Sequence, residues 1–251
     1  MKFKNKVVLI TGASSGIGFE LAKIFAEEKS NLVLLARSYD KLLELRSDHP
    51  NADIEIYKCD VSNKSEIIEV FNKIKLRHDF IDLSILNSAV AYRMKVEDFN
   101  SNLAEETINT NFLGMIYCIE QLLPSYLKKK SGIIAGVSSL ADNRGYSGSG
   151  FYCASKSAVT TYLEGLSVEL KKYGVKVITI KPGFVKTPMT DKNEFKMPFL
   201  MSSEKAAKII FDGLTKEKRF IQFPKPTVFG YKIIGLIPDK LYEYLAFKKR
   251  L

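Results

Sequence analysis

The amino-acid sequence predicts an α/β fold: a single doubly wound parallel β-sheet of about seven strands, flanked by helices. Two observations predict this class. Short apolar runs rich in β-branched residues alternate along the chain with longer stretches whose apolar residues recur every three or four positions. A glycine-rich turn separates the first apolar run from the first helical stretch. This alternation predicts parallel strands joined by right-handed helical crossovers.

The first half of the chain contributes four of the predicted strands. They are the apolar runs at 6–11, 31–36, 53–59 and 81–87. The first helix follows the glycine-rich turn, because Ile17, Leu21 and Ile24 recur there at helical spacing. Two further helices are predicted between the strands, at 39–48 and 63–77.

The second half of the chain continues the same pattern. Further strands are predicted at 132–138, 175–182 and 219–223, and helices at 104–129, 150–173 and 202–214. Ser202 or Ser203 would cap the last of these helices. Because no linker, repeat or low-complexity stretch interrupts the chain, we expect residues 1–251 to form one domain, with a basic, aromatic C-terminal segment from about 224 to 251.

The composition excludes several classes of protein. The three cysteines are odd in number and far apart, which indicates a reducing compartment, so we expect a cytoplasmic protein. No cysteine or histidine spacing matches a metal site, and we expect no metal. No apolar run approaches the length of a membrane span, about 18 residues. The net charge is +10, but no nucleic-acid recognition motif accompanies it, and we expect no nucleic-acid partner.

The positive charge is concentrated toward the C-terminus. Residues 216–251 contain nine Lys or Arg and three Asp or Glu, a difference of +6, together with many aromatic residues. This composition fits a helix lying on an anionic membrane surface, and it fits a helix packed across a subunit interface equally well. The sequence leaves both interpretations open.

The glycine-rich turn reads TGASSGIG and spans 11–18. Gly12 permits a tight turn, Gly16 permits close approach of a pyrophosphate, and Gly18 permits close packing of the helix on the sheet. The backbone N–H groups of Ser14, Ser15 and Ile17 accompany the positive end of the helix dipole. The position of this turn, between the first strand and first helix, predicts dinucleotide binding rather than a plain Gly-Ser turn.

The end of the second predicted strand discriminates between cofactors. NAD sites usually carry an acidic residue there, but this chain has Ala36 followed by Arg37 and Ser38. A guanidinium binds a 2′-phosphate in a charge-assisted pair, and Ser38 adds a hydrogen bond. We therefore expect NADP(H) as the cofactor, although an ordinary solvated arginine is the alternative.

Several short motifs together resemble the short-chain dehydrogenase/reductase family over residues 6 to about 190. They are, in order, TGASSGIG, CDV (59–61), NSAV (87–90), NTNFLG (109–114), VSS (137–139), YCASK (152–156) and KPGFVKT (181–187). The resemblance implies a Rossmann-type fold, a nicotinamide cofactor and a catalytic group formed by Ser139, Tyr152, Lys156 and Asn111. It further implies that the cofactor contacts Asp60, Val61, Asn87, Ala89, Pro182, Gly183, Val185 and Thr187.

The catalytic group makes chemical sense from the residues themselves. Tyr152 and Lys156 are four residues apart and share one helix face. A free phenol has a pKa of about 10, and a neighbouring ammonium is expected to lower it toward working pH. Ser139 would donate a hydrogen bond to a substrate oxygen, and Asn111 would position a water that feeds protons to Lys156. Each residue alone has a structural alternative, as a surface, turn or backbone-satisfying residue.

The sequence departs from the family at Val90, where a glycine is common, so the shape of the pocket near the nicotinamide is expected to differ. The segment 184–201 covers substrate in this family. It contains Phe184, Met189, Phe195, Met197, Phe199, Leu200 and Met201, which predict a lipophilic substrate unless they simply fill the core.

The expected function is NADP(H)-dependent interconversion of a ketone or aldehyde and an alcohol on a 3-oxoacyl, sphingoid, steroid or retinoid-like substrate. The alternatives are a non-catalytic dinucleotide sensor or scaffold, and a peripheral membrane-binding protein. Because the helices at 104–129 and 150–173 resemble the subunit-packing helices of the family, we expect a homodimer or homotetramer.

Overall fold

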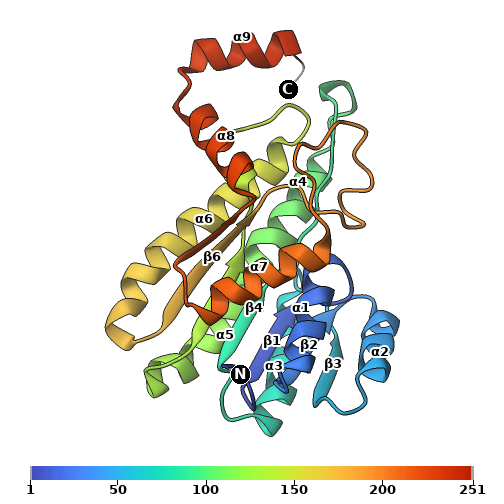
Figure 1. The fold of residues 1–251 in the computed structure, drawn as a ribbon, viewed down its shortest axis with the longest axis vertical. Helices are drawn as coiled ribbons and strands as arrows, with labels where there is room; N and C mark the ends of the chain where they lie inside the picture. The colour runs from blue at the N-terminus through green and yellow to red at the C-terminus, as the bar shows by residue number, and fades with distance from the viewer. Residues whose placement is uncertain (1, 250–251) are drawn as a thin grey trace.

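The computed structural model describes residues 2–249, whose centre is one parallel sheet of seven strands (Figure 1). The strands lie in the order β3-β2-β1-β4-β5-β6-β7. Their bounds are β1 Val7–Thr11, β2 Asn31–Ala36, β3 Ile54–Lys58, β4 Leu83–Leu86, β5 Ile133–Val137, β6 Lys176–Pro182 and β7 Phe220–Phe223. This architecture confirms the predicted doubly wound, Rossmann-type fold.

The direction of winding reverses at β1, which pairs with β2 on one side and with β4 on the other. Connections that leave β1 and β4 therefore diverge to opposite faces of the sheet. The divergence opens a crevice at the carboxyl ends of these strands, which is where ligands bind in sheets of this kind.

Helices cover both faces of the sheet because neighbouring residues in a strand point to opposite sides. Ile10 belongs to the core beneath α1, α2 and α7, whereas Leu9 belongs to the core beneath α3, α5 and α6. The bounds of these helices are α1 Gly16–Glu27, α2 Tyr39–Asp48, α7 Ser203–Thr215, α3 Lys64–Arg77, α5 Gly114–Lys129 and α6 Gly150–Leu170. Short 3-10 turns occur at η1 Val96–Asp98, η3 Leu140–Asp142 and η4 Lys171–Tyr173.

The helix predicted at 104–129 differs from the structure in two respects. The helical run begins three residues earlier, as α4 (Ser101–Ile108), and passes through a π-helical segment, η2 (Asn109–Leu113), before it becomes α5. A π segment inserts a residue into the helical repeat and is frequently found at functional sites. Asn111 lies within it.

The C-terminal segment forms two helices, α8 (Lys225–Leu236) and α9 (Asp239–Lys249), which extend from one end of the molecule at the top of Figure 1. Both attach to the loop after η3. The Arg144 guanidinium donates to the carbonyl of Ile237, and the Tyr242 hydroxyl donates to the carbonyl of Gly145 at 2.6 Å. Within residues 2–249, none of the helices combines the length and the hydropathy needed to cross a bilayer.

Candidate active site

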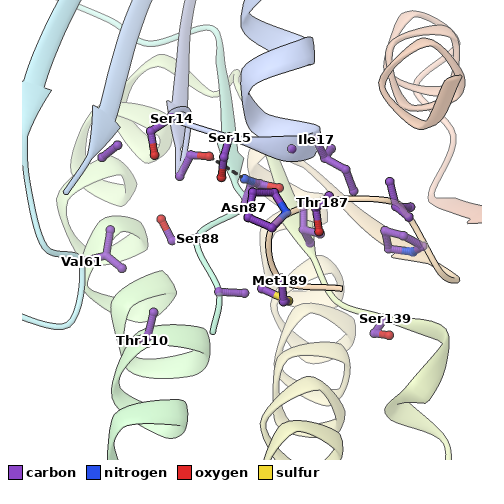
Figure 2. A pocket seen from close by; sticks show the side chains of 18 of the residues that line it. Ser14, Ser15, Ile17, Val61, Asn87, Ser88, Thr110, Ser139, Thr187 and Met189 are labelled. Atoms are coloured by element: carbon purple, nitrogen blue, oxygen red, sulfur yellow. Dashed lines mark hydrogen bonds between the residues drawn. The ribbon is translucent and has the colours of Figure 1, made fainter. Parts of the chain in front are cut away.

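An open cleft of about 330 Å³ lies at the carboxyl ends of the strands (Figure 2). It is lined by loops that follow β1, β2, β3, β4, β5 and β6. Of the predicted cofactor-contacting residues, those that line the cleft are Gly12, Ser14, Ser15, Gly16, Ile17, Arg37, Ser38, Asp60, Val61, Asn87, Ala89, Tyr152, Lys156, Pro182, Gly183, Val185 and Thr187. The strand order thus brings residues from all of the predicted cofactor-binding motifs, from Gly12 to Thr187, into one cleft.

The glycine-rich turn has the geometry of a phosphate cradle. Gly12 and Gly16 have φ angles of +67° and +55°, which lie in the left-handed region that favours glycine. A Cβ on Gly16 would come within 2.7 Å of the Thr187 side chain and narrow the cleft. A Cβ on Gly18 would come within 2.3 Å of the Gly12 carbonyl oxygen, so Gly18 serves the packing of α1 on the turn. These features fit a dinucleotide whose pyrophosphate lies against the N-terminus of α1.

Asn87 holds the turn against the neighbouring strand. Its side-chain amide donates to the carbonyl oxygens of Thr11 and Gly12, each at 3.1 Å. In return the Thr11 hydroxyl oxygen accepts from the backbone N–H groups of Asn87 and Ser88, at 3.0 and 3.2 Å. This exchange links the carboxyl ends of β1 and β4 and fixes the floor of the cleft.

Asp60 follows β3, at the adenine-binding position implied by the resemblance. One of its carboxylate oxygens accepts from the backbone N–H and the hydroxyl of Ser62, at 2.9 and 2.7 Å. The Asp60 backbone N–H donates to the Glu66 carboxylate at 2.8 Å. The side chain is therefore held in place at the edge of the cleft before any ligand arrives.

Arg37 and Ser38 lie where β2 ends and α2 begins. Ser38 occupies the N-cap position of α2, and its side chain makes no capping hydrogen bond to any residue that the structure describes. Its hydroxyl and the first N–H groups of α2 thus remain available to an anion. Arg37 is exposed, and its charge is close enough to Tyr92 to lower the pKa of that phenol, although burial raises this pKa overall.

Ser139, Tyr152 and Lys156 meet at the same cleft. Ser139 follows β5, and its hydroxyl oxygen accepts from the Ala141 backbone N–H at 3.1 Å, which leaves its own proton free to donate. Tyr152 and Lys156 project from the first two turns of α6. The Lys156 ammonium donates to the Val137 carbonyl at 2.9 Å and lies 5.8 Å from the centre of the Tyr152 ring.

The charge states of this pair differ from the sequence-based expectation. Burial raises the pKa of Tyr152 above its usual value, and the Ser139 hydroxyl only partly offsets that rise. Burial also lowers the pKa of Lys156 to about 8. The prediction that Lys156 lowers the phenol pKa is therefore wrong for the direction of the shift in this structure. The reason is that Lys156 is buried and Tyr152 is half-buried, and loss of contact with water disfavours ammonium and phenolate alike.

Asn111 is buried and does not line the cleft. Its carboxamide oxygen accepts from the Val90 backbone N–H at 2.7 Å, and its NH₂ group donates to the Val90 carbonyl and the Ser155 hydroxyl at 2.9 and 3.0 Å. The side chain thus ties the π segment to the loop after β4 and to α6. Its participation in proton delivery to Lys156 stays a prediction.

Val90 occupies its position without backbone strain. It is not among the described residues with positive φ, so the conformation requires no glycine there. Its side chain is buried, and both of its backbone polar groups are bonded to Asn111. The departure from the family pattern is accommodated by the local packing.

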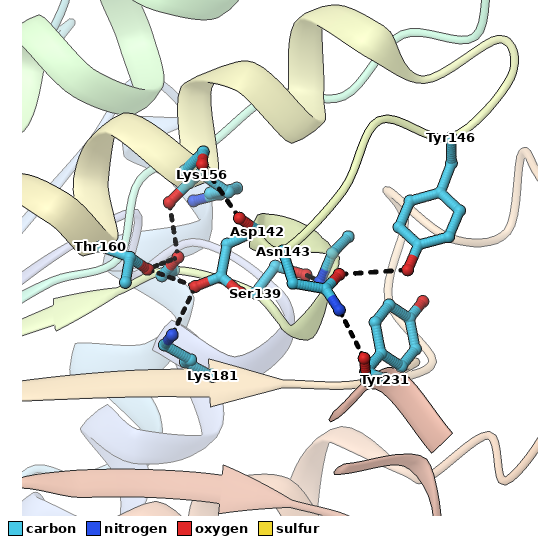
Figure 3. A network of polar contacts seen from close by, with 11 residues as sticks. Ser139, Asp142, Asn143, Tyr146, Lys156, Thr160, Lys181 and Tyr231 are labelled. Atoms are coloured by element: carbon cyan, nitrogen blue, oxygen red, sulfur yellow. Dashed lines mark hydrogen bonds and ion pairs between the residues drawn. The ribbon is translucent and has the colours of Figure 1, made fainter. Parts of the chain in front are cut away.

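A polar network beneath the site escaped the sequence analysis (Figure 3). The Lys181 ammonium, on β6, pairs with the Asp142 carboxylate at 2.6 Å, and both side chains are largely buried. The Thr160 hydroxyl donates to the Asp142 carboxylate and contacts the Ser138 hydroxyl. No spacing in the sequence links these residues, because the chain brings them together only through the sheet.

Other residues that line the cleft were also missed by sequence reasoning. They are Ala36, Cys59, Ser88, Thr110, Val137, Ser138, Pro188, Met189 and Thr190. Met189 belonged to the predicted substrate-covering segment but not to the cofactor set. Most of the others adjoin a predicted residue, so extending each motif by one position would have found them.

The substrate-covering segment, 184–201, folds over the end of the cleft as a closed loop. Its two ends join through backbone hydrogen bonds between Phe184 and Met201 and between Lys186 and Met201. Phe184 and Phe195 pack edge to face at 5.7 Å, and Arg93 lies 4.5 Å from the Phe195 ring. Phe199 and Leu200 point outward and are exposed.

A Rossmann-type sheet with a phosphate cradle and a Ser-Tyr-Lys group at its edge defines a class of oxidoreductases. The family model described as short chain dehydrogenase matches residues 6–197. The chain belongs to the short-chain dehydrogenase/reductase family, a family of oxidoreductases.

Curated relatives cover most of the chain. An uncharacterized oxidoreductase of Myxococcus xanthus is 30% identical over 247 residues, which are 98% of each chain. An uncharacterized oxidoreductase of Staphylococcus haemolyticus is 33% identical over 215 residues, 86% of this chain and 93% of the relative.

Solved structures share the fold at lower identity. A Burkholderia phymatum short-chain dehydrogenase/reductase in complex with NAD has a TM-score of 0.84 at 21% identity and covers 92% of this chain and 93% of its own. A Sphingobium yanoikuyae short-chain dehydrogenase in complex with NADPH has a TM-score of 0.80 at 22% identity, with coverages of 93% and 97%. At such identities the likeness establishes the fold.

Proposed function

We propose that this protein is an NADP(H)-dependent oxidoreductase that interconverts a ketone or aldehyde and the corresponding alcohol, and that its substrate is lipophilic. The observation that carries the proposal is the meeting of Ser139, Tyr152 and Lys156 at the cleft that holds the glycine-rich turn. A non-catalytic dinucleotide sensor or scaffold would need the glycine-rich turn to bind its ligand. It would not need a hydrogen-bond donor, a proton donor and a cation placed together beside that ligand. Their joint presence favours catalysis.

The chain's own residues supply the proton and the hydrogen bonds in carbonyl reduction. Because burial keeps the pKa of Tyr152 high, its phenol is protonated at neutral pH and donates its proton to the oxygen on which negative charge develops. The Ser139 hydroxyl is held by Ala141 with its proton free, and it donates to the same oxygen. In alcohol oxidation the proton returns to Tyr152.

A bound nicotinamide dinucleotide supplies or accepts the hydride. The turn 12–18 would hold its pyrophosphate, Asp60 its adenine, and Lys156 its nicotinamide ribose. Lys156 donates only one of its protons to Val137, so the others are available for ribose hydroxyls. Thr187 lies across the turn from Gly16, in reach of the carboxamide side of the cleft.

NADP(H) is proposed over NAD(H) because the Arg37 guanidinium and the Ser38 hydroxyl follow β2, at the position where an NAD site carries a carboxylate. The Ser38 hydroxyl makes no capping hydrogen bond and is available to a 2′-phosphate. Among proteins of the same fold, one solved structure is in complex with NAD and another with NADPH. The choice therefore depends on the residues of each chain, here Arg37 and Ser38.

A lipophilic substrate is proposed because apolar and aromatic side chains gather in the covering loop and beside the loop after Ser139. Phe184 and Phe195 pack together in the covering loop, and Met189 lines the cleft itself. Tyr146 and Tyr231 form a second aromatic pair, 5.6 Å apart, beside the loop after Ser139. These surfaces suit a 3-oxoacyl, sphingoid, steroid or retinoid-like chain better than a sugar.

We also propose that the protein works in the cytoplasm as a homodimer or homotetramer. The three free, buried cysteines are consistent with a reducing compartment. Helices α5 and α6, which would carry the subunit contacts, stand side by side on one face of the sheet. The mass of the purified protein by light scattering tests the oligomeric state.

The decisive experiment compares the wild type with Tyr152→Phe. The wild type is expected to oxidise NADPH with a ketone from a panel of steroids and 3-oxoacyl compounds. Tyr152→Phe removes the transferable proton and is expected to lower turnover by at least 10³-fold, with cofactor affinity changed less than about threefold. Tyr162→Phe, on the same helix, is the control and should retain full activity. Turnover retained in Tyr152→Phe would reject the mechanism.

A further inference from the structure

Large hydrophobic side chains are exposed in unusual density on α8 and α9. These helices carry six of the sixteen exposed large hydrophobic residues found among the residues that the structure describes, although they contain only 23 residues. The six are Phe229, Ile233 and Leu236 on α8, and Leu241, Tyr244 and Phe247 on α9. Exposed apolar residues gathered in this way mark a surface that contacts something else.

The spacing of the three residues on α8 places them on one side of that helix. Phe229, Ile233 and Leu236 follow the i, i+4, i+7 pattern of a single helix face. The opposite face of α8 packs against the body of the protein, where Thr227 is only 5% exposed. Exposed lysines flank the apolar side chains, namely Lys225, Lys232, Lys240 and Lys248. The six apolar residues and these four lysines are called the outer face below.

The inner sides of the two helices are fixed to the catalytic end of the molecule. The Asn143 amide donates to the Tyr231 carbonyl at 2.6 Å, and the Arg144 guanidinium lies 4.3 Å from the Tyr242 ring. Arg144 also pairs with Asp239 at 3.3 Å, which offsets one of the few acidic charges nearby. The outer face is therefore presented by helices that are anchored to the loop between η3 and α6.

We propose that the outer face docks on the surface of an anionic lipid bilayer. The apolar side chains would enter the boundary between headgroups and acyl chains, and the lysines would meet lipid phosphates, as in amphipathic helices that lie in the membrane plane. Charge decides between this occupant and a second copy of the chain. Two copies joined through this same patch would bring eight lysines together, whereas anionic headgroups complement each of them.

The location gives docking a consequence for substrate access. Tyr231 lies on the inner side of α8, where its carbonyl accepts from the Asn143 amide and its ring packs against Tyr146 at 5.6 Å. A single helix thus separates the outer face from the loop that joins Ser139 to α6, the helix that carries Tyr152. Provided that the proposed function holds, a lipophilic substrate would pass from the bilayer along α8 into the cleft.

The test is flotation of the full-length protein with vesicles of phosphatidylglycerol and phosphatidylcholine, and with vesicles of phosphatidylcholine alone. Binding is expected only to the anionic vesicles and should weaken as salt rises. Each lysine near the surface contributes about 1 kcal/mol, so Lys232→Gln/Lys240→Gln should weaken binding roughly 25-fold.

The matched pair of variants is Leu236→Ser and Leu76→Ser. The two leucines are 84% and 88% exposed, and Leu76 lies on α3, away from the outer face. Leu236→Ser is expected to weaken vesicle binding by about tenfold or more, and Leu76→Ser to leave it unchanged. Equal binding by both variants, or equal flotation with both kinds of vesicle, overturns the proposal. A change of molecular mass in Leu236→Ser without a change in vesicle binding also overturns it, in favour of a second copy.

The assay contains neither cofactor nor substrate, so its outcome is independent of the proposed reaction. Reduction of a water-soluble ketone by Leu236→Ser serves as a separate readout. Unchanged turnover with lost vesicle binding supports docking and leaves the reaction intact. Vesicle binding by a wild type that turns over no carbonyl compound supports docking while rejecting the proposed function.

Discussion

At the scale of single residues, burial of the Lys156 ammonium lowers the free energy of unfolding by an amount that depends on pH. Its pKa falls to about 8 in the folded chain, whereas an unfolded lysine has a pKa of about 10.4. Between these values the unfolded chain binds more protons than the folded one, so this residue makes stability rise with pH. Below pH 8 its full destabilising effect is present, about 3 kcal/mol in total.

Lys156→Met removes this titration. We expect the free energy of unfolding of the wild type to rise relative to that of Lys156→Met by about 3 kcal/mol between pH 7.5 and pH 10.5. Urea denaturation at the two pH values measures the change. Lys171→Met, at the exposed end of α6, is the control and should show no such trend. A difference that stays constant with pH would contradict the buried charge.

The pair formed by Lys181 and Asp142 is the second residue-scale feature with a predicted effect. The Lys181 and Asp142 side chains are 13% and 6% exposed. Removing the Lys181 cation therefore leaves the Asp142 carboxylate buried without its ion-pair partner. Lys181→Met is expected to lower the free energy of unfolding by about 3–5 kcal/mol at pH 7.

The double variant Lys181→Met/Asp142→Asn is the control for that prediction. It removes both charges, and an amide oxygen can still accept from Thr160. Most of the stability should return at pH 7 in urea denaturation. A double variant as unstable as Lys181→Met would mean that lost packing, not the unpaired charge, causes the effect.

At the scale of elements, the π segment depends on Asn111. Asn111→Ala leaves the N–H and C=O groups of Val90 buried without partners, and we expect a loss of about 2–5 kcal/mol in the free energy of unfolding. Asn109→Ala is a matched control in the same segment, since the Asn109 side chain makes no hydrogen bond to the described residues. Similar losses in both variants, by thermal or urea denaturation, would show that a general disturbance of the π segment and not this tie is responsible.

The elements also show how far local sequence carries a fold prediction. The seven strands fall where apolar β-branched runs are, because burial on both faces leaves a continuous local pattern. The π segment leaves no such pattern, because the apolar stripe from Ile108 to Leu122 predicts one continuous helix. The bond from Asn111 to Val90, 21 residues away, has no local sign in the sequence either. The C-terminal segment could be predicted as helical, but its division into α8 and α9 and its anchoring depend on the distant loop at 143–146.

The candidate site likewise contains some features that could be predicted from the sequence and others that could not. Residues in contiguous motifs, such as Gly12 to Gly18, could be placed from sequence because a turn between a strand and a helix fixes their geometry. The direction of the Tyr152 pKa could not, since it depends on burial contributed by residues throughout the chain. Asp142 and Lys181 carry no local sign of their pairing for the same reason.

At the scale of the whole molecule, the net charge of +10 favours anionic ligands. We expect the preference for NADPH over NADH to be greatest at low salt and to fall several-fold between 20 and 300 mM NaCl, because screening weakens the interaction with the additional phosphate. Fluorescence titration of both cofactors measures the ratio of dissociation constants. Arg37→Gln should flatten this salt dependence, while Arg46→Gln, on α2, should not. A ratio unaffected by salt in the wild type would exclude an electrostatic origin.

Cys118 and Cys153, two of the three buried thiols, lie in different parts of the molecule. Cys118 lies in the core beneath α5, Cys153 lies beside Tyr152 and below the C-terminal helices, and burial raises the pKa of both. An alkylating reagent requires an accessible thiolate, so it reacts with either cysteine only during a transient opening. The rate at which Cys153 is alkylated therefore reports how often α8 and α9 detach from the body of the protein. The rate at which Cys118 is alkylated reports how often the core beneath α5 opens.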